Sequence, residues 1–272
     1  MAGLDDLQLG KPTAYVDSYT PSLLDSVPRS LMREPLDITG PALPFTGVDR
    51  WMGYELSWLN RKGRPEVAVL RVTIPAQSSH VPESKSFKLY LGSFANSQFV
   101  SRADVENTIE SDLKLAVRAP VIVEVLPLES VSEISSFTGE SLDVQEIGAE
   151  EYDVNPHLLA LTGGPTVRET VFSHLLRTLC PVTGQPDWGS VWIQYAGSEI
   201  DRAGLLRYIV SYRNHQGFHE EAVERMFVDI TARCAPTSLS VYARYLRRGG
   251  LEIDPFRSNK DAEAPELRLS RQ

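Results

Sequence analysis

Two stretches of the chain decide the fold, YLGSFANSQFVSRADVE at residues 90–106 and YIVSYRNHQGFHEEAVE at residues 208–224. They align without a gap at the offset of 118 residues that separates Tyr90 from Tyr208. Six positions are identical, namely Tyr90/Tyr208, Ser93/Ser211, Asn96/Asn214, Gln98/Gln216, Val105/Val223 and Glu106/Glu224. Asparagine is a poor helix former, so its recurrence is not what a helix pattern alone would produce. We interpret the alignment as an internal duplication.

Both halves of the chain show the same order of elements around this repeat. The spacing of apolar residues predicts two strands, two helices and one or two further strands in each half. In the first half these are 51–60, 65–76, 83–99, 101–117 and 119–127. In the second half they are 169–179, 190–196, 201–213, 219–234, 238–247 and 250–256. The expected fold class is α+β, with an antiparallel sheet and a helix pair on one face in each half.

The remaining segments suggest how these units are delimited. We expect an extended, mostly loop-like arm at 1–48, a first unit at 49–135, an acidic linker at 136–165, a second unit at 166–258 and a loose polar tail at 259–272.

Composition narrows the classes of partner. The formal net charge is −9, whereas proteins that bind a phosphate backbone usually carry a basic excess, so direct binding of nucleic acid is not expected. No secretory signal pattern and no run of about 20 apolar residues occurs, so we expect no membrane contact. Cys180 and Cys234 are the only cysteines and form no disulfide pattern, which favours a reducing, cytoplasmic location.

One of these cysteines lies in an unusual place, the turn-rich stretch CPVTGQPDWGS at residues 180–190. We expect this turn to expose the thiol of Cys180 at a loop mouth, with the carboxyl group of Asp187 close behind. A thiolate is a strong nucleophile, and a carboxylic acid can protonate the atom that receives charge when sulfur attacks. The alternative is a capped loop that carries an aspartate in a turn.

The stretch FHEE at residues 218–221 is a second candidate. His219 and Glu220 begin a predicted helix, where unpaired N–H groups and the positive end of the dipole favour a ligand or simply suit an acidic first turn. His215 and His219 have the spacing of metal ligands, but Gly217 separates them and no further cluster of Cys or His follows, so no metal is expected.

Two basic stretches are candidates for phosphate contacts. In ESKSFKLY at 83–90, Glu83 can accept two hydrogen bonds from an amidine-like edge, and Lys85 and Lys88 can meet phosphates, although solvated lysines at a helix start are more common. In RRGGLEIDPFRS at 247–258, the arginines and glycines suit either a phosphate site or a hairpin turn. No G-x-G-x-x-G or P-loop pattern is present.

Taken together, ESKSFKLYLGSF, CPVTGQPDWGS, SYRNHQGFHEE and YARYLRRGGLEIDPFRS resemble the QueF family of nitrile reductases, in its longer two-unit form. The resemblance extends from about Tyr15 to Arg257. It implies two tandem tunnelling-fold (T-fold) units, a homodimer, and NADPH-dependent reduction of the nitrile of 7-cyano-7-deazaguanine to 7-aminomethyl-7-deazaguanine, a step of queuosine biosynthesis for tRNA modification.

The resemblance also assigns residues. Cys180 matches the nucleophile that forms a covalent thioimide, and Asp187 matches the proton donor. The matching substrate-binding positions are Glu83, Ser84, His219 and Glu220, and the matching NADPH-binding positions are Ser84, Lys85, Arg248 and Gly249.

The duplication adds an expectation. At the same offset Glu83 falls on Asp201 and Ser101 on His219, and the first half has no cysteine. We therefore expect one active site per chain, made by complementary units. Two other functions remain open, a cysteine-dependent nitrile or amide hydrolase that needs no NADPH, and a non-catalytic module that binds purine-like or pterin-like ligands.

Overall fold

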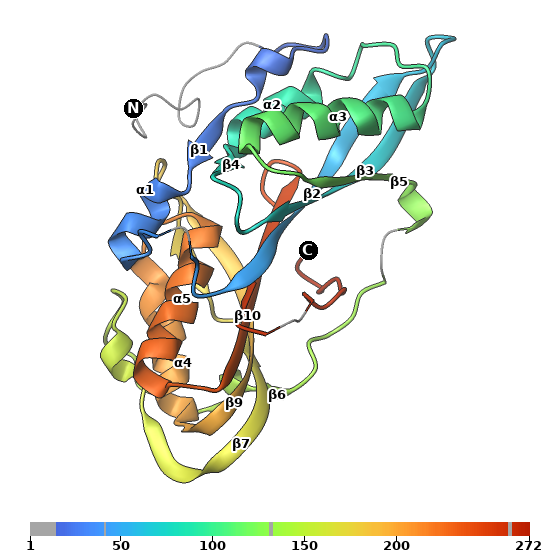
Figure 1. The fold of residues 1–272 in the computed structure, drawn as a ribbon. Coiled ribbons are helices and arrows are strands. Elements are labelled where there is room, and N and C mark those ends of the chain that lie inside the picture. The colour runs from blue at the N-terminus through green and yellow to red at the C-terminus, as the bar shows by residue number, and fades with distance from the viewer. Residues whose placement is uncertain (1–14, 41, 131–132, 261–262) are drawn as a thin grey trace. The chain divides into compact units, whose positions relative to one another are not determined.

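The computed structural model describes residues 15–40, 42–130, 133–260 and 263–272, so the first 14 residues of the expected arm lie outside the described residues. The chain divides into two compact units (Figure 1). Unit 1 takes its described residues from Met1–Leu31, Asp49–Ser132 and Arg247–Ile253. Unit 2 takes its described residues from Met32–Val48, Glu133–Leu246 and Asp254–Gln272. Each unit is therefore discontinuous along the chain, because strands β2 and β11 contribute residues to both.

Unit 1 is an antiparallel sheet with a helix pair on one face, as the sequence predicts (Figure 1). The sheet has the order β5-β3-β2, and β3 pairs with β5 in antiparallel register. The bounds are β2 Thr46–Leu59, β3 Pro65–Pro75, α2 Ser84–Gly92, α3 Arg102–Val117 and β5 Ile122–Leu126. The arm is not purely loop-like, because it contains β1 (Ser26–Pro28), which pairs with β4 (His80–Pro82), and the short helix α1 (Ser30–Arg33).

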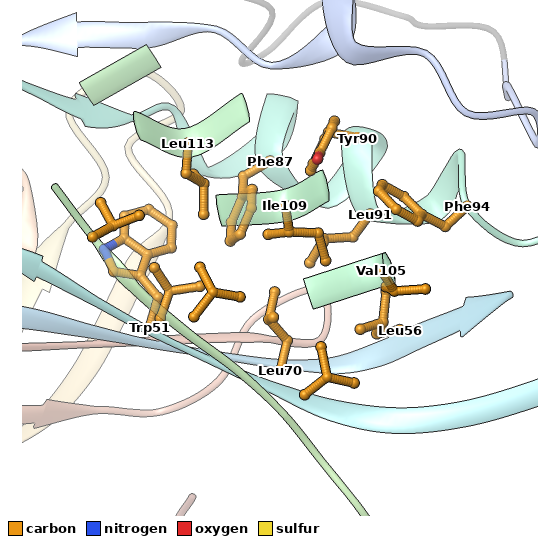
Figure 2. Close-up of a cluster of buried hydrophobic side chains, with 14 of the residues drawn as sticks. Trp51, Leu56, Leu70, Phe87, Tyr90, Leu91, Phe94, Val105, Ile109 and Leu113 are labelled. Carbon is orange, nitrogen blue, oxygen red and sulfur yellow. The ribbon is translucent and has the colours of Figure 1, made fainter. Parts of the chain in front are cut away.

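The core of unit 1 follows from the periods of these elements (Figure 2). Helix α3 carries Val105, Ile109, Leu113 and Val117 four residues apart, and all four are buried. Such spacing places side chains on one helix face. They pack with the aromatic residues of α2 and with inward-facing residues of the sheet such as Leu70.

The helix predicted at 83–99 is shorter than expected, and the prediction was wrong beyond Gly92. After α2 the chain turns, and the Ser93 hydroxyl donates to the carbonyl of Tyr90. It then runs beside β2, where the Leu59 N–H donates to Ser97 and the Phe99 N–H donates to Leu59. The backbone groups that a longer helix would have used are bound to a strand.

Unit 2 repeats the plan with a larger sheet, in the order β11-β10-β9-β7-β6, while β8 pairs with β9. The pairs of β9 with β7, β8 and β10 are antiparallel, and the short β6 pairs with β7 in parallel. The bounds are β6 Glu140–Ser141, β7 Leu161–Ser173, β8 Arg177–Leu179, β9 Pro186–Ile200, α4 Arg202–Ser211, α5 His219–Cys234, β10 Ser238–Tyr245 and β11 Leu251–Ser258. The prediction of α5 at 219–234 is confirmed, and Cys234 is buried at its end.

Matched hydrogen bonds inside each unit accompany the internal sequence repeat. Glu83 caps α2 and Asp201 caps α4, each through its side-chain carboxylate. The hydroxyls of Ser93 and Ser211 donate to the carbonyls of Tyr90 and Tyr208, at 2.6 and 2.7 Å. Leu59 forms a parallel bridge with Gln98, and Leu179 forms the same bridge with Gln216. The repeat is therefore a repeat of backbone geometry.

Candidate active site

Cys180 follows β8 directly and opens a tight turn. Its N–H donates to the carbonyl of Gln185 at 2.8 Å, and the N–H of Gly184 donates to its carbonyl at 3.0 Å. Gly184 has φ of 66°, a left-handed conformation that glycine adopts without steric cost. The turn folds back over the cysteine, whose sulfur accepts from the Thr183 N–H at 3.5 Å. The expectation of an exposed thiol was therefore wrong, since Cys180 is only 3% exposed.

Asp187 lies on the strand that pairs with β8. It is directly opposite Thr178, and a directly opposite pair places both side chains on the same face of the sheet. Its Oδ2 is 3.5 Å from Nε2 of His219, and the residue is buried. The structure thus brings the predicted acid and the predicted histidine together in unit 2.

The start of α5 is held beside β8 by two backbone hydrogen bonds. The Leu179 N–H donates to His215 at 2.7 Å, and the Gly217 N–H donates to Leu179 at 3.1 Å. The N-cap residue of α5 is Phe218, whose side chain accepts no hydrogen bond from the first turn. The helix end next to His219 and Glu220 therefore has no side-chain cap. A helix N-terminus favours negative charge, and this one lies in the same neighbourhood as the Cys180 turn.

A buried ion pair supports this corner of the site. Glu221 accepts from His215 Nε2 at 2.6 Å and from Arg225 Nε at 2.8 Å. Gly217 leaves room for the contact between His215 and Glu221, because a Cβ at position 217 would lie 2.6 Å from Nε2 of His215. His215 is therefore held by a carboxylate, and across the described residues no group of three or more His, Cys, Asp or Glu side chains could hold a metal ion.

Sequence reasoning missed two residues of this neighbourhood, Thr178 and Tyr245. Tyr245 is fully buried, and its ring stacks on that of His219 with 3.7 Å between centroids and 3° between planes. Its hydroxyl lies near that of Thr178, but neither hydroxyl makes a hydrogen bond of good geometry. Burial, together with the charges of Asp187, Glu221 and Glu220, raises the pKa of Tyr245 far above its usual value. The stretch YARYLRRGG contains Tyr245, but strand alternation alone makes it an ordinary core residue.

The other predicted residues lie in unit 1, at the start of α2. Both carboxylate oxygens of Glu83 accept backbone N–H groups, from Lys85 and from Ser86, each at 2.8 Å. Burial raises the pKa of Glu83, although these two hydrogen bonds oppose the shift. The structure gives Glu83 the role of helix cap, with room in its lone pairs for further donors. Ser84 follows it and is half-buried.

The predicted NADPH-binding residues, Ser84, Lys85, Arg248 and Gly249, all belong to unit 1. The turn at Arg248 and Gly249 lies against α2, since a Cβ on Gly249 would meet Cδ of Lys88 at 3.1 Å and its Nζ at 3.3 Å. Gly249 has φ of 58°. Lys88 Nζ is 3.2 Å from Oε2 of Glu55. Lys85 and Lys88 of α2 therefore share a neighbourhood with the glycine turn, a basic setting that suits phosphate.

Comparison with known proteins decides the family. A model described as nitrile reductase, 7-cyano-7-deazaguanine-reductase N-term, matches residues 15–125, and one described as QueF-like protein matches residues 186–264. A protein of Dechloromonas aromatica (strain RCB), named NADPH-dependent 7-cyano-7-deazaguanine reductase, is 53% identical over 260 residues, which cover 95% of this chain and 92% of the relative. A protein of the same name from Burkholderia multivorans (strain ATCC 17616 / 249) is 51% identical over 268 residues, 97% of each chain.

The chain belongs to the QueF family of nitrile reductases. The resemblance found in the sequence is thereby confirmed. The first matched range contains Glu83, Ser84 and Lys85, and the second contains Asp187 together with the start of α5. Cys180 falls between the two ranges and follows β8, the strand whose Thr178 lies opposite Asp187. Within the described part of the chain, no helix has the length and apolar character that a membrane crossing needs.

Proposed function

We propose that the chain reduces the nitrile of 7-cyano-7-deazaguanine to 7-aminomethyl-7-deazaguanine through a covalent thioimide on Cys180. Family membership makes it an NADPH-dependent nitrile reductase. The observation that carries the covalent mechanism is a cluster in unit 2. The buried thiol of Cys180 lies at the end of β8, and on the paired strand the carboxyl group of Asp187 lies opposite Thr178.

The chemistry needs this pair of groups. A nitrile carbon is a weak electrophile, and addition of the Cys180 thiolate splits one difficult reduction into easier steps. The Sγ–C bond forms as one π bond of the nitrile breaks, and the nitrogen takes a proton that we assign to Asp187. His219, with Nε2 at 3.5 Å from Oδ2 of Asp187, holds that carboxyl group in place.

Two molecules of NADPH, bound one after the other, would supply the two hydrides needed to take the thioimide carbon to the amine. The thiolate of Cys180 leaves after the first reduction, and the resulting imine would hydrolyse to an aldehyde if water reached it. Cys180, Asp187 and Glu220 are each less than 9% exposed, which supports a site that excludes water.

We assign substrate recognition to His219 and Glu220 in unit 2, and to Glu83 and Ser84 in unit 1. A guanine-like edge presents two N–H donors side by side, and a carboxylate accepts both in a fork. Glu220 is buried in the first turn of α5, a position where a helix end also favours its negative charge.

The NADPH-binding residues in this proposal are Ser84, Lys85, Arg248 and Gly249. The residues present fit a phosphate-bearing cofactor, because a helix start and a left-handed glycine turn lie beside two lysine side chains. Lys88 adds a second amine to this setting.

The proposal extends to the organisation of the enzyme. Each unit is proposed to be a T-fold unit, since each consists of an antiparallel sheet with a helix pair. We also propose a homodimer, a cytoplasmic location, and a product that serves tRNA modification without direct binding of nucleic acid by this acidic chain.

Intact-protein mass spectrometry tests the covalent step. The wild type and a Cys180→Ala variant are mixed with 7-cyano-7-deazaguanine in the absence of NADPH. An adduct with the mass of the nitrile on the wild type alone is expected, and NADPH should then discharge it as the amine. Reversible binding without an adduct would overturn the thioimide, and release of an acid with NADPH unused would identify a hydrolase.

A further inference from the structure

Tyr245 is the closest aromatic neighbour that the structure gives His219. The two rings are almost parallel, at 3° between planes, and their centroids are 3.7 Å apart. A face-to-face contact of this kind blocks rotation of the imidazole out of its plane. The edge of the imidazole that carries Nε2 is 3.5 Å from Asp187.

The position of Tyr245 is itself enforced by the sheet. It is the last residue of β10 and lies opposite Gly189 on β9. A Cβ on Gly189 would lie 3.2 Å from Cδ1 and 3.3 Å from Cε1 of the tyrosine ring, and 3.2 Å from Leu176. Because Gly189 has no side chain, the ring of Tyr245 can lie flat against it.

The hydroxyl of Tyr245 does not explain why the residue lies here. It is fully buried and makes no hydrogen bond of good geometry. A buried hydroxyl without a partner costs stability, so the useful part of the side chain is the ring. The charges of Asp187, Glu221 and Glu220 act on this hydroxyl and raise its pKa.

We propose that Tyr245 is a positioning residue of the reductase site, whose ring holds the His219 imidazole with Nε2 turned toward Asp187, in the space that Gly189 leaves open. This inference rests on the proposed function, in which His219 and Asp187 serve the substrate bound at Cys180. Tyr245 acts through His219 and touches no reacting atom.

Steady-state kinetics with 7-cyano-7-deazaguanine and NADPH tests the inference on the full chain. In Tyr245→Leu the stack is lost, and we expect kcat/KM to fall about 10- to 100-fold, the size of effect that misplacement by about 1 Å produces. In Tyr245→Phe the ring is kept, and kcat/KM should stay within about twofold of wild type. Tyr242→Phe, on the same strand but on the opposite face by strand alternation, is the control and should leave the kinetics unchanged.

A double-mutant cycle separates positioning from general loosening of the core. If Tyr245 acts through His219, then Tyr245→Leu should lower kcat/KM of a His219→Ala enzyme by no more than about twofold. Full additivity of the two changes, or a loss in Tyr245→Phe as large as in Tyr245→Leu, would overturn the proposal.

Gly189→Ala provides a second route if Tyr245→Leu does not fold. The added methyl group presses on the ring without deleting it, so kcat/KM should fall in the wild-type background and change little in the His219→Ala background. The adduct experiment keeps the two hypotheses apart. An adduct on the wild type together with additive kinetics refutes only the role of Tyr245, whereas absence of the adduct refutes the covalent function.

Discussion

The turn after β2 in unit 1 and the turn after β8 in unit 2 are closed by a similar pair of backbone hydrogen bonds, with one more residue in the second turn, and they carry different side chains. Asn60 donates its N–H to Arg64 and accepts from Gly63, as Cys180 donates to Gln185 and accepts from Gly184. Glu66 lies two residues beyond Arg64, and Asp187 lies two residues beyond Gln185. Asn60 therefore stands where the second unit has its thiol.

The side chains of the unit 1 turn satisfy one another. The Glu66 carboxylate accepts from Asn60 Nδ2 at 3.0 Å and from Arg64 Nη2 at 2.7 Å. These hydrogen bonds, that of Arg64 above all, lower the pKa of Glu66. A pocket of about 300 Å³ remains there, lined by Trp58, Asn60, Glu66, Phe99, Val100, Ser101 and Arg102.

The unit 2 turn differs in its surroundings. The buried hydroxyl groups of Thr178 and Tyr245 lie near each other there, without a hydrogen bond of good geometry. Buried polar atoms without partners are tolerated mainly where function requires them. The two turns therefore share one scaffold, while the thiol that we propose as the nucleophile lies in the unit 2 turn.

Because unit 1 has Asn60 where unit 2 has Cys180, we predict one covalent adduct per chain. Cys180→Ala should abolish the adduct and lower turnover by on the order of 10⁴-fold or more, because the amide of Asn60 is no nucleophile. Asn60→Ala should leave the adduct intact. Adduct stoichiometry by intact mass checks both variants, and two adducts on the wild type would contradict the comparison.

The two carboxyl groups should differ almost as strongly. Asp187→Asn removes the proposed acid and should lower kcat by about 10²- to 10⁴-fold, the usual worth of a positioned acid. Glu66→Gln, at the equivalent position of unit 1, should leave kcat unchanged. Single-turnover kinetics with NADPH measures both rates, and equal losses in the two variants would show that the turns are not functionally distinct.

The identical pair Glu106 and Glu224 sharpens the comparison at the level of stability. Glu224 accepts from Arg33 at 2.7 and 2.8 Å and from Arg257 at 2.8 and 3.0 Å, and all three residues are buried. Glu224→Gln leaves two buried guanidinium groups without that charge, so the free energy of unfolding should fall by about 3–5 kcal/mol.

Glu106 is the matched control for this change. It is only half-buried, and its Oε2 accepts a single N–H, that of Val125 at 2.8 Å. Glu106→Gln should cost about 1 kcal/mol. Urea unfolding of both variants gives the two values, and a larger loss for Glu106→Gln would reverse the assignment of the buried charge network to unit 2.

The smallest expected effect concerns the two helix starts. Ser101 caps α3 by accepting from the Asp104 N–H at 3.2 Å, whereas α5 has no side-chain cap. Ser101→Ala should therefore lower stability by about 1 kcal/mol and leave KM unchanged. His219→Ala should raise KM and barely change the melting temperature. Thermal unfolding and steady-state kinetics measure the melting temperature and KM of both variants. The prediction is contradicted if both variants change only the melting temperature or only KM.

The helices were predictable where the apolar spacing was strong. Helix α3 and helix α5 have strong apolar spacing, and both lie where the sequence predicts them. The prediction extended helix α2 too far because Ser97 and Gln98 give no local sign that their backbone pairs with β2. That pairing is a contact between segments distant in the chain, and local propensity does not encode it.

The amino-acid sequence alone indicated the duplication and the α+β fold class, because short spacings and residue types carry that information. Through the family resemblance it also named Cys180, Asp187, His219 and Glu220 as the site residues that we propose. Only the tertiary structure decided that the thiol is buried, that Glu83 caps α2, and that Tyr245 stacks on His219. Burial and stacking depend on which distant strands and helices pack together. Such packing is a property of the whole unit that a stretch of sequence does not show.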